Sequence, residues 1–127
     1  MHLTFANPPG VHAPASRYSH VAILEGGSRL LISGQIGVRP DGSVVEEPEA
    51  QIAQAVANLG TILGAHGLGP ANIAKMGVFL TDRALIPVWR AERERFLGTC
   101  APASTMLIVA GLADPRLVFE VEAEAVG

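Results

Sequence analysis

The last quarter of the chain reads Pro102-Ala103-Ser104-Thr105, then Val109-Ala110-Gly111-Leu112, then Leu117-Val118-Phe119-Glu120-Val121-Glu122-Ala123. A proline followed by small polar residues marks a turn, and the apolar run after it predicts a strand over residues 104–109. Over residues 117–126 acidic and apolar residues alternate, which is the period of a strand with its acids on one face. We expect these two strands to pair with each other and to carry an ordered carboxylate.

Two helices are predicted upstream of these strands. The first begins at Pro48, a residue suited to the first helical position, and ends near Gly67, a natural left-handed cap. Its apolar residues follow the spacing of one buried stripe: Ile52, Ala55, Val56, Leu59, Ile62 and Leu63. The second helix follows Thr81-Asp82 and ends at Gly98, with a regular part that begins near Ile86. Its predicted inward residues are Leu85, Val88, Trp89 and Phe96.

Three further strands are predicted before and between the helices. Residues 21–24 and 29–36 are mostly apolar and predict a hairpin that turns at Gly26-Gly27, and residues 73–80 predict a strand between the helices. Both helices therefore cross over between strands and should lie on one face of a mixed sheet. The expected class is α+β, with a single domain over residues 1–127.

The composition predicts contact with another subunit. Of the 127 residues, 49% are hydrophobic and only 17% are charged. A domain of this size has a large surface for its volume, so the apolar excess suggests that a second copy covers part of it. The net charge of −3 argues against a nucleic-acid partner. The densest basic group alternates with acids and is expected to be an exposed, self-neutralising helix face: Arg90, Glu92, Arg93, Glu94 and Arg95.

We expect a cytoplasmic protein with no membrane partner. No apolar run has the length of a membrane span, and the N-terminal residues do not form a recognisable signal peptide. The lone Cys100 excludes an internal disulfide and fits a reducing compartment. The four histidines show no spacing typical of metal ligands, so neither a metal site nor a cofactor is expected.

Two more motifs, added to the last quarter of the chain, give a family resemblance: Ser33-Gly34-Gln35-Ile36 and Val78-Phe79-Leu80-Thr81-Asp82. From about Tyr18 to the C-terminus the sequence resembles the RidA (YjgF) family of enamine/imine deaminases, whose members have often been labelled ribonucleases. The resemblance implies a mixed six-stranded sheet with two helices on one face, similar to the chorismate-mutase fold. It also implies a homotrimer that binds small molecules in clefts between its subunits.

The final strand carries the candidate catalytic residue. Glu120, Glu122 and Glu124 alternate and should point to the face opposite the helices. That face is either a solvated polar surface or one wall of a cleft, where burial would raise the pKa of a carboxylate into the range of a general base. The resemblance matches Glu120 to the glutamate that positions and activates the attacking water. Glu124 is expected to be a surface or interface acid.

Ser104 is the main departure from the family pattern. The resemblance places it where the deaminases carry an arginine that holds the substrate carboxylate in a planar, two-pronged contact, which serine cannot imitate. Its loss should weaken the binding of a carboxylate substrate by about 2–5 kcal/mol. The donors that remain are the hydroxyls of Ser104 and Thr105 and the backbone N–H groups near Met106. Arg116, in the following turn, is either a substitute for the arginine or an exposed turn residue.

Tyr18 and Gly34 complete the predicted substrate-binding site. The resemblance matches Tyr18 to an aromatic residue that covers the cleft and Gly34 to a backbone position close to the ligand. The alternative for Gly34 is a bulge in its strand. Where the deaminases often have an asparagine in the second helix, this chain has Trp89-Arg90, and we expect Trp89 to pack in the core.

Three functions compete on these residues. The first is hydrolytic deamination of reactive imines or enamines, with an atypical substrate preference caused by Ser104. The second is non-catalytic binding of a small ligand by a trimer that keeps the cleft. The third, chorismate-mutase-type chemistry, requires cationic groups around a dianion, which the region of Ser104 does not supply. The presence of Glu120 favours the first.

Overall fold

The computed structural model describes residues 2–15, 18–25 and 29–127. These residues form six strands and two α-helices. In chain order they are β1 (His2–Ala6), β2 (Val21–Glu25), β3 (Arg29–Ile36), α1 (Pro48–Ala65), β4 (Ile73–Leu80), α2 (Ile86–Leu97), β5 (Ala103–Ile108) and β6 (Phe119–Val126). A 3-10 turn precedes β4 at Pro70–Asn72 and another precedes α2 at Arg83–Leu85.

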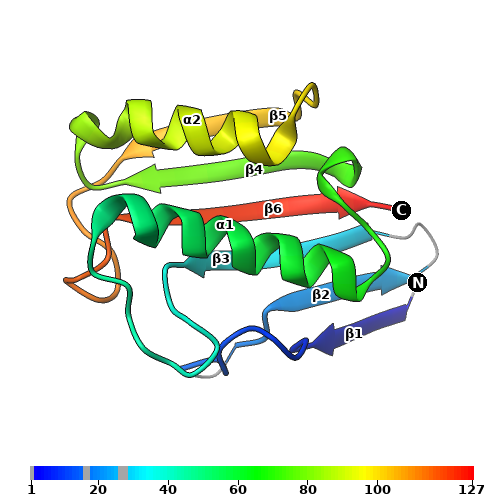
Figure 1. Ribbon diagram of the computed structural model, residues 1–127. Helices are drawn as coiled ribbons and strands as arrows, with labels where there is room; N and C mark the ends of the chain where they lie inside the picture. The colour runs from blue at the N-terminus through cyan, green and yellow to red at the C-terminus, as the bar shows by residue number, and fades with distance from the viewer. Residues whose placement is uncertain (1, 16–17, 26–28) are drawn as a thin grey trace.

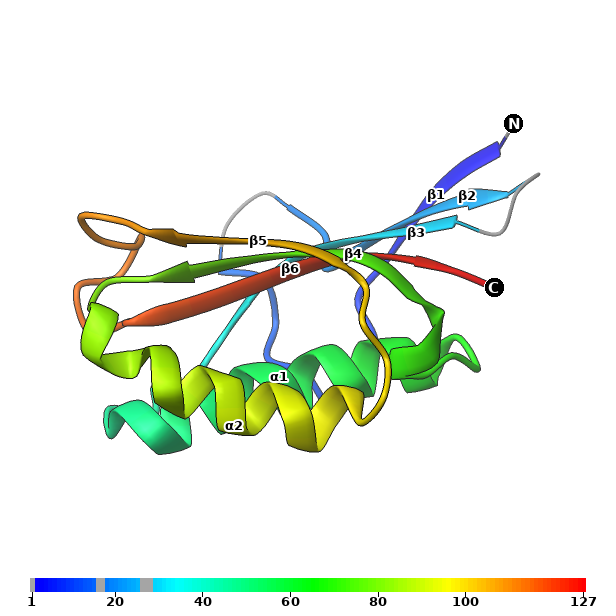
Figure 2. The same cartoon turned by 90° about the horizontal axis from the view of Figure 1, so that it is seen from above.

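All six strands belong to one mixed sheet in the order β1-β2-β3-β6-β4-β5. Neighbouring strands are antiparallel except β4 and β5, which are parallel because α2 carries the chain back between them. Figures 1 and 2 show that α1 and α2 lie side by side on one face of the sheet and leave the other face open. The predicted fold, a mixed six-stranded sheet with two helices on one face, is confirmed.

Helix α1 begins and packs as its sequence predicts. The Glu47 carboxylate caps its N-terminus by accepting hydrogen bonds from the backbone N–H groups of Glu49 and Ala50 at 3.1 and 2.7 Å. All six residues of the predicted apolar stripe are buried. In α2, Trp89 is 2% exposed and packs on Phe119 of β6 with ring centroids 5.2 Å apart. The two helices are thereby fixed against the central strands.

Two features of the sheet differ from the sequence-based expectation. Strand β1 is an additional edge strand whose five residues pair with β2, and it was missed because short edge strands give little periodic signal. The expected direct pairing of the last two strands is wrong, since β4 lies between β5 and β6. Sequence order misled here because a crossover helix lets β5 join the sheet at its edge. The predicted hairpin turn at Gly26-Gly27 lies outside the described residues.

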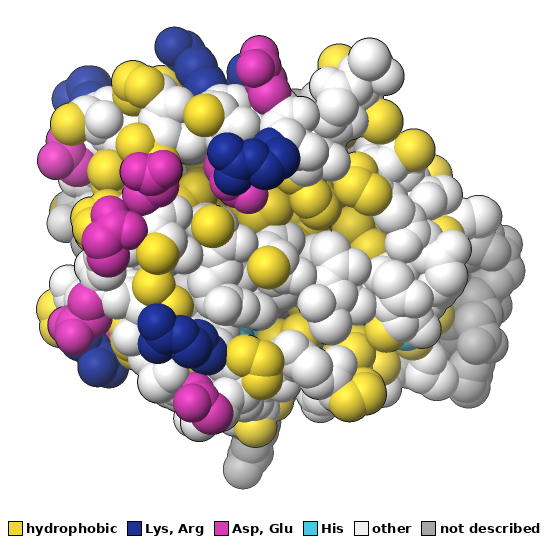
Figure 3. Space-filling model, in the orientation of Figure 1, with side chains coloured by type: hydrophobic (Ala, Val, Ile, Leu, Met, Phe, Trp, Pro, Cys, Tyr) yellow, Lys and Arg dark blue, Asp and Glu magenta, His cyan; other side chains and the backbone are white. Residues whose placement is uncertain are grey.

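The helix-covered face is polar and mixed in charge. Figure 3 shows Lys and Arg side chains interspersed with Asp and Glu, and hydrophobic side chains between them. On α2, Arg95 donates to Glu92 at 2.7 Å, as the expected self-neutralising face requires. Within the described part of the chain, no helix combines the length and hydropathy needed to cross a bilayer.

Candidate active site

The Glu120 carboxylate lies directly over the Cα of Gly34 on the neighbouring strand. A Cβ at Gly34 would lie 2.7 Å from the carboxyl carbon of Glu120 and would overlap one of its oxygens. The register of β3 against β6 shifts between Ile32 and Gln35, so Gly34 also lies in a bulge. The reading of Gly34 as a bulge is therefore the one that the structure shows, and the absence of a side chain also leaves space for the Glu120 carboxylate.

The environment of Glu120 disfavours its charge. Partial burial raises the pKa of the Glu120 carboxyl above its ordinary value, and the negative charge of Glu122 raises that pKa further. As predicted, the acids of β6 lie on the open face, while Phe119 and Val121 are fully buried beneath the helices. A half-buried carboxylate with a raised pKa is a better proton acceptor near neutral pH than a solvated one.

Hydrogen bonds bring the segment that contains Tyr18 to the same place. The Ser33 hydroxyl donates to the carbonyl oxygen of Ser19 at 2.6 Å, and the Ser33 N–H donates to the carbonyl oxygen of His20 at 2.8 Å. The Tyr18 side chain is 39% exposed. The segment of Tyr18 is therefore held beside Ser33, the residue that precedes Gly34.

A buried polar network anchors this segment, and sequence reasoning missed it. His20 is 1% exposed, and its Nε2 lies 2.8 Å from the carbonyl oxygen of His12. A carbonyl only accepts, so this nitrogen carries the proton, and Nδ1 accepts from the Gln35 side-chain amide at 3.0 Å. The rings of Tyr18 and His20 meet edge to face with centroids 5.7 Å apart. Two of the four histidines, His12 and His20, therefore have a structural role.

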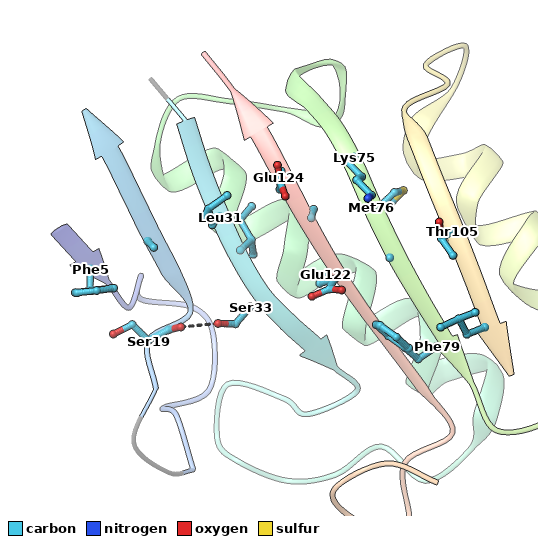
Figure 4. A pocket seen from close by; sticks show the side chains of 15 residues that line it. Phe5, Ser19, Leu31, Ser33, Lys75, Met76, Phe79, Thr105, Glu122 and Glu124 are labelled. Atoms are coloured by element: carbon cyan, nitrogen blue, oxygen red, sulfur yellow. Dashed lines mark hydrogen bonds between the residues drawn. The ribbon is translucent and has the colours of Figure 1, made fainter. Parts of the chain in front are cut away.

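A hollow lies on the open face of the sheet, next to the segment that contains Ser19. It has a volume of about 650 Å³ and runs from Phe5 of β1 across β3 and β6 to Thr105 of β5 (Figure 4). Glu122 lies within it and leans over Gly77, where a Cβ would approach the Glu122 Oε1 to 2.8 Å. Glu124 also lines the hollow, and it accepts from Arg29 at 3.0 Å, as expected of a surface acid.

The structure separates Ser104 and Met106 from Glu120. Ser104 pairs in register with the buried Met76 and Met106 with the buried Val78, so both side chains lie on the helix-covered side of β5. Only Thr105, between them, faces the open side where the glutamates lie. The expectation that Ser104 sits on the strand beside Glu120 is wrong, because the side-chain period of two and the intervening β4 place the two residues apart.

Arg116 does not lie beside Ser104 in the same chain. It is an exposed residue of the loop after β5, and its guanidinium is bound by Asp114 at 2.8 and 3.1 Å. That ion pair lowers the pKa of the Asp114 carboxyl to about 2. Ser104 is near the start of β5 and Arg116 follows its end, so the reading of Arg116 as an exposed turn residue is the one that fits.

A second hollow, of about 430 Å³, lies where the C-terminal half of α2 meets the start of β5. Ser104 lines it together with Arg93, Thr99 and Cys100. Arg93 is half-buried, so it does not belong to the exposed, self-neutralising face that the sequence predicted. The signal that identifies it is its spacing of four residues from Trp89 and from Leu97, which are both buried.

No group of His, Cys, Asp and Glu among the described residues has the arrangement of a metal site. The Ser33 hydroxyl and the His20 imidazole, near the segment of Tyr18, are engaged in hydrogen bonds within the chain. The arrangement can therefore accept a proton at Glu120, beside the hollow of the open face.

The fold and this site define a small α+β protein whose open sheet face carries acids and a hollow. Residues 10–127 match the family model described as Endoribonuclease L-PSP, and the chain belongs to this family, which confirms the RidA relationship. It is 38% identical over 121 residues to a RutC family protein of Pasteurella multocida, with 91% of this chain and 92% of the relative covered.

Two further comparisons agree with this assignment. The chain is 36% identical over 120 residues to the 2-iminobutanoate/2-iminopropanoate deaminase of Salmonella typhimurium, covering 91% of this chain and 92% of the relative. Its fold is similar to the crystal structure of RidA from an Antarctic Psychrobacter, with a TM-score of 0.89 and 27% identity over 97% of this chain and 98% of the other. The homologues thus support an imine deaminase role at the level of the family.

Proposed function

We propose that this protein hydrolyses small imines or enamines and that Glu120 is its general base. The observation that carries the proposal is the placement of the Glu120 carboxylate over Gly34, partly buried, beside the anchored segment of Tyr18. A relative that is 36% identical over nearly the whole chain is an imine deaminase, which supports the same reaction type here.

In the proposed reaction, water adds to the carbon of the C=N bond. As the water oxygen forms its bond to that carbon, Glu120 accepts a proton from the water and the C=N electron pair moves to nitrogen, which takes up a proton from solvent. The resulting carbinolamine loses ammonia when Glu120 returns its proton to the departing nitrogen, and the hydroxyl releases its proton to solvent as it becomes a carbonyl. The balance is one imine and one water consumed, one carbonyl compound and one ammonia released.

We further propose that the active form is a homotrimer whose cleft lies between two subunits. In one chain Glu120 and Ser104 lie on opposite faces of the sheet, so a single copy does not bring them to one ligand. The open face carries exposed apolar side chains, among them Phe5 at 63% and Leu107 at 49%, that a second copy would cover. The Ser104 side of one subunit would then face the Glu120 side of its neighbour.

The substrate preference is proposed to differ from that of an arginine-bearing deaminase. Ser104 offers a hydroxyl where a two-pronged guanidinium contact would be needed, so short 2-imino acids should be poor substrates. The preferred substrate lacks an α-carboxylate or has it held by another residue. A trimer that only binds a ligand is the alternative that the following experiment distinguishes.

The test compares Glu120→Gln with Glu122→Gln and Glu124→Gln on a panel of imines generated in the assay, with release of ammonia as the readout. Glutamine keeps the size of Glu120 but cannot accept the proton, so kcat should fall about 10²–10⁴-fold while ligand affinity changes little. Glu124→Gln removes only an exposed ion pair and should leave kcat nearly unchanged. Equal small effects at all three positions, or no turnover by the wild type on any imine, would contradict the proposal.

A further inference from the structure

We propose that Arg93 is the residue that binds the substrate anion, and that the hollow between α2 and β5 takes a small monocarboxylate. This inference deepens the proposed function and rests on it, because the hollow becomes part of the substrate cleft only when a second subunit brings its Glu120 there. The inference gives this cleft a positively charged residue, although Ser104 stands where the family resemblance implies an arginine.

The position of Arg93 on α2 is unusual for a charged residue. Trp89 and Leu97 lie one turn before and one turn after it, and they are 2% and 6% exposed. Residues four apart share a face of a helix, so Arg93 lies in the middle of the stripe that packs on the sheet. Arg95, two residues farther along α2, has an exposed side chain that is paired with Glu92.

Half-burial of a guanidinium costs free energy unless another group offsets its charge. Within the described part of the chain, the ion pairs formed by arginines involve Arg29, Arg95 and Arg116, and none involves Arg93. The Arg93 side chain instead borders the hollow of about 430 Å³. An anion that entered this hollow would supply the missing partner.

The lining of the hollow selects the class of anion. Arg93 brings one positive charge and five N–H donors in a planar fork, and Ser104 and Thr99 add hydroxyls that can also donate. Glu94 borders the same hollow and brings one negative charge. A dianion such as phosphate would meet one cation and one repelling carboxylate, whereas a single carboxylate matches the fork and carries less charge toward Glu94.

This arrangement changes where a substrate carboxylate would be held. Arg93 enters the hollow from the helix layer, whereas an arginine at position 104 would enter it from strand β5. A carboxylate held by Arg93 therefore sits at a different distance from the catalytic carboxylate of the neighbouring subunit. The substrates that follow are imino acids with a longer carbon chain than the short 2-imino acids.

The experiment measures binding of 2-oxohexanoate, a stable monocarboxylate, by calorimetry to the full chain at fixed ionic strength. Hexan-2-one, which has the same carbonyl chain without the carboxylate, and inorganic phosphate are the comparison ligands. The variants are Arg93→Gln, Arg93→Lys, Glu94→Gln and the matched control Arg95→Gln. Thermal unfolding with and without 2-oxohexanoate gives a second readout that requires no turnover.

Wild type should bind 2-oxohexanoate more tightly than hexan-2-one or phosphate. Arg93→Gln should weaken binding of 2-oxohexanoate about tenfold or more, since a hydrogen-bonded charge is lost, and Arg95→Gln should stay within about twofold. Arg93→Lys should recover only part of the affinity because it lacks the planar fork. Glu94→Gln should strengthen binding. The ligand should raise the Tm of wild type and of Arg95→Gln but not of Arg93→Gln.

Equal affinities of Arg93→Gln and Arg95→Gln, tighter binding of phosphate or hexan-2-one, or no saturable binding of 2-oxohexanoate by wild type would each overturn the inference. If Arg93→Gln does not fold, the other two variants decide the outcome. Arg93→Lys should bind 2-oxohexanoate more weakly than wild type, and Glu94→Gln should bind it more tightly. Turnover of imines with equal Arg93→Gln and Arg95→Gln affinities would reject Arg93 and keep the deaminase. Binding that depends on Arg93, without turnover of any imine, would keep Arg93 as the anion-binding residue and reject the deaminase.

Discussion

The Glu120 carboxylate occupies the space that a side chain at Gly34 would need. The closest atoms belong to the far end of a flexible side chain, and Gly34 does not lie in the left-handed region of backbone conformations. A residue larger than glycine can therefore be accommodated, but only when the carboxylate moves. This relationship makes the position of the candidate base sensitive to a substitution on another strand.

Gly34→Ala should reduce activity far more than stability. The new Cβ would displace the Glu120 carboxylate, so kcat should fall by about 10²-fold or more, while the free energy of unfolding should change by no more than about 1–3 kcal/mol. Ammonia release and urea unfolding measure the two quantities. Gly77→Ala is the matched control, because it meets Glu122 in the same way. A variant at Gly34 with the kcat of wild type would show that the carboxylate position does not matter.

Glu122→Gln should move the pH profile of the reaction toward acid. The negative charge of Glu122 disfavours ionisation of Glu120, so its removal lowers the Glu120 pKa. A general base must be ionised, and activity is lost as pH falls through its pKa; the acidic limb of kcat/KM should therefore shift to lower pH. Rates measured between about pH 4 and pH 8 give the limb. An unchanged limb, or a shift to higher pH, would contradict this coupling.

Ser104→Arg should improve the hydrolysis of short 2-imino acids. An arginine on β5 can hold the carboxylate with two parallel hydrogen bonds, and kcat/KM for 2-iminobutanoate should rise about tenfold or more over wild type. Ser104→Gln has a long side chain without the charge and should give no such gain. If wild type already hydrolyses 2-iminobutanoate as fast as Ser104→Arg, the importance given to this position is wrong.

The chain should be a trimer at micromolar concentration. Light scattering should give a mass about three times the 13.2 kDa of one chain, because the open sheet face exposes apolar side chains that association would cover. Leu107→Glu places a charge on that face and should lower the mass while each chain remains folded. A single-chain mass across dilution would reject both the trimer and the cleft between subunits.

Most of the architecture could be predicted because its signals are local. The bounds of β3 and β4 and the buried stripe of α1 follow from apolar periodicity, and the start of α1 at Pro48 follows from its cap. The Glu residues of β6 were placed on the correct face for the same reason. A period of two or of 3.6 is a property of neighbouring residues, so it survives in a single sequence.

The site was less predictable because it depends on strand order and register. The contact between Glu120 and Gly34 needs a bulge in β3, and the separation of Ser104 from Glu120 needs β4 between their strands. Neither the bulge nor the position of β4 in the sheet is set by residues that are neighbours in the sequence. The network of His12, His20 and Gln35 joins segments 8 and 15 residues apart, with no repeated spacing to indicate it. The partial burial of Arg93 could have been predicted from its spacing of four residues from Trp89 and Leu97. The neighbouring acids instead favoured the prediction of an exposed face.

The division of the predicted site between the two faces of one sheet has a consequence for how such a protein can change. Gly34 and Glu120 are fixed by a bulge and a close contact, and a hydrogen bond from Ser33 holds the segment of Tyr18, so a substitution there disturbs its neighbours. Ser104 and Arg93 line a separate hollow at the sheet edge. Under the proposed function, selection can therefore alter which molecules are recognised at that edge while the acid–base chemistry at Glu120 is left intact.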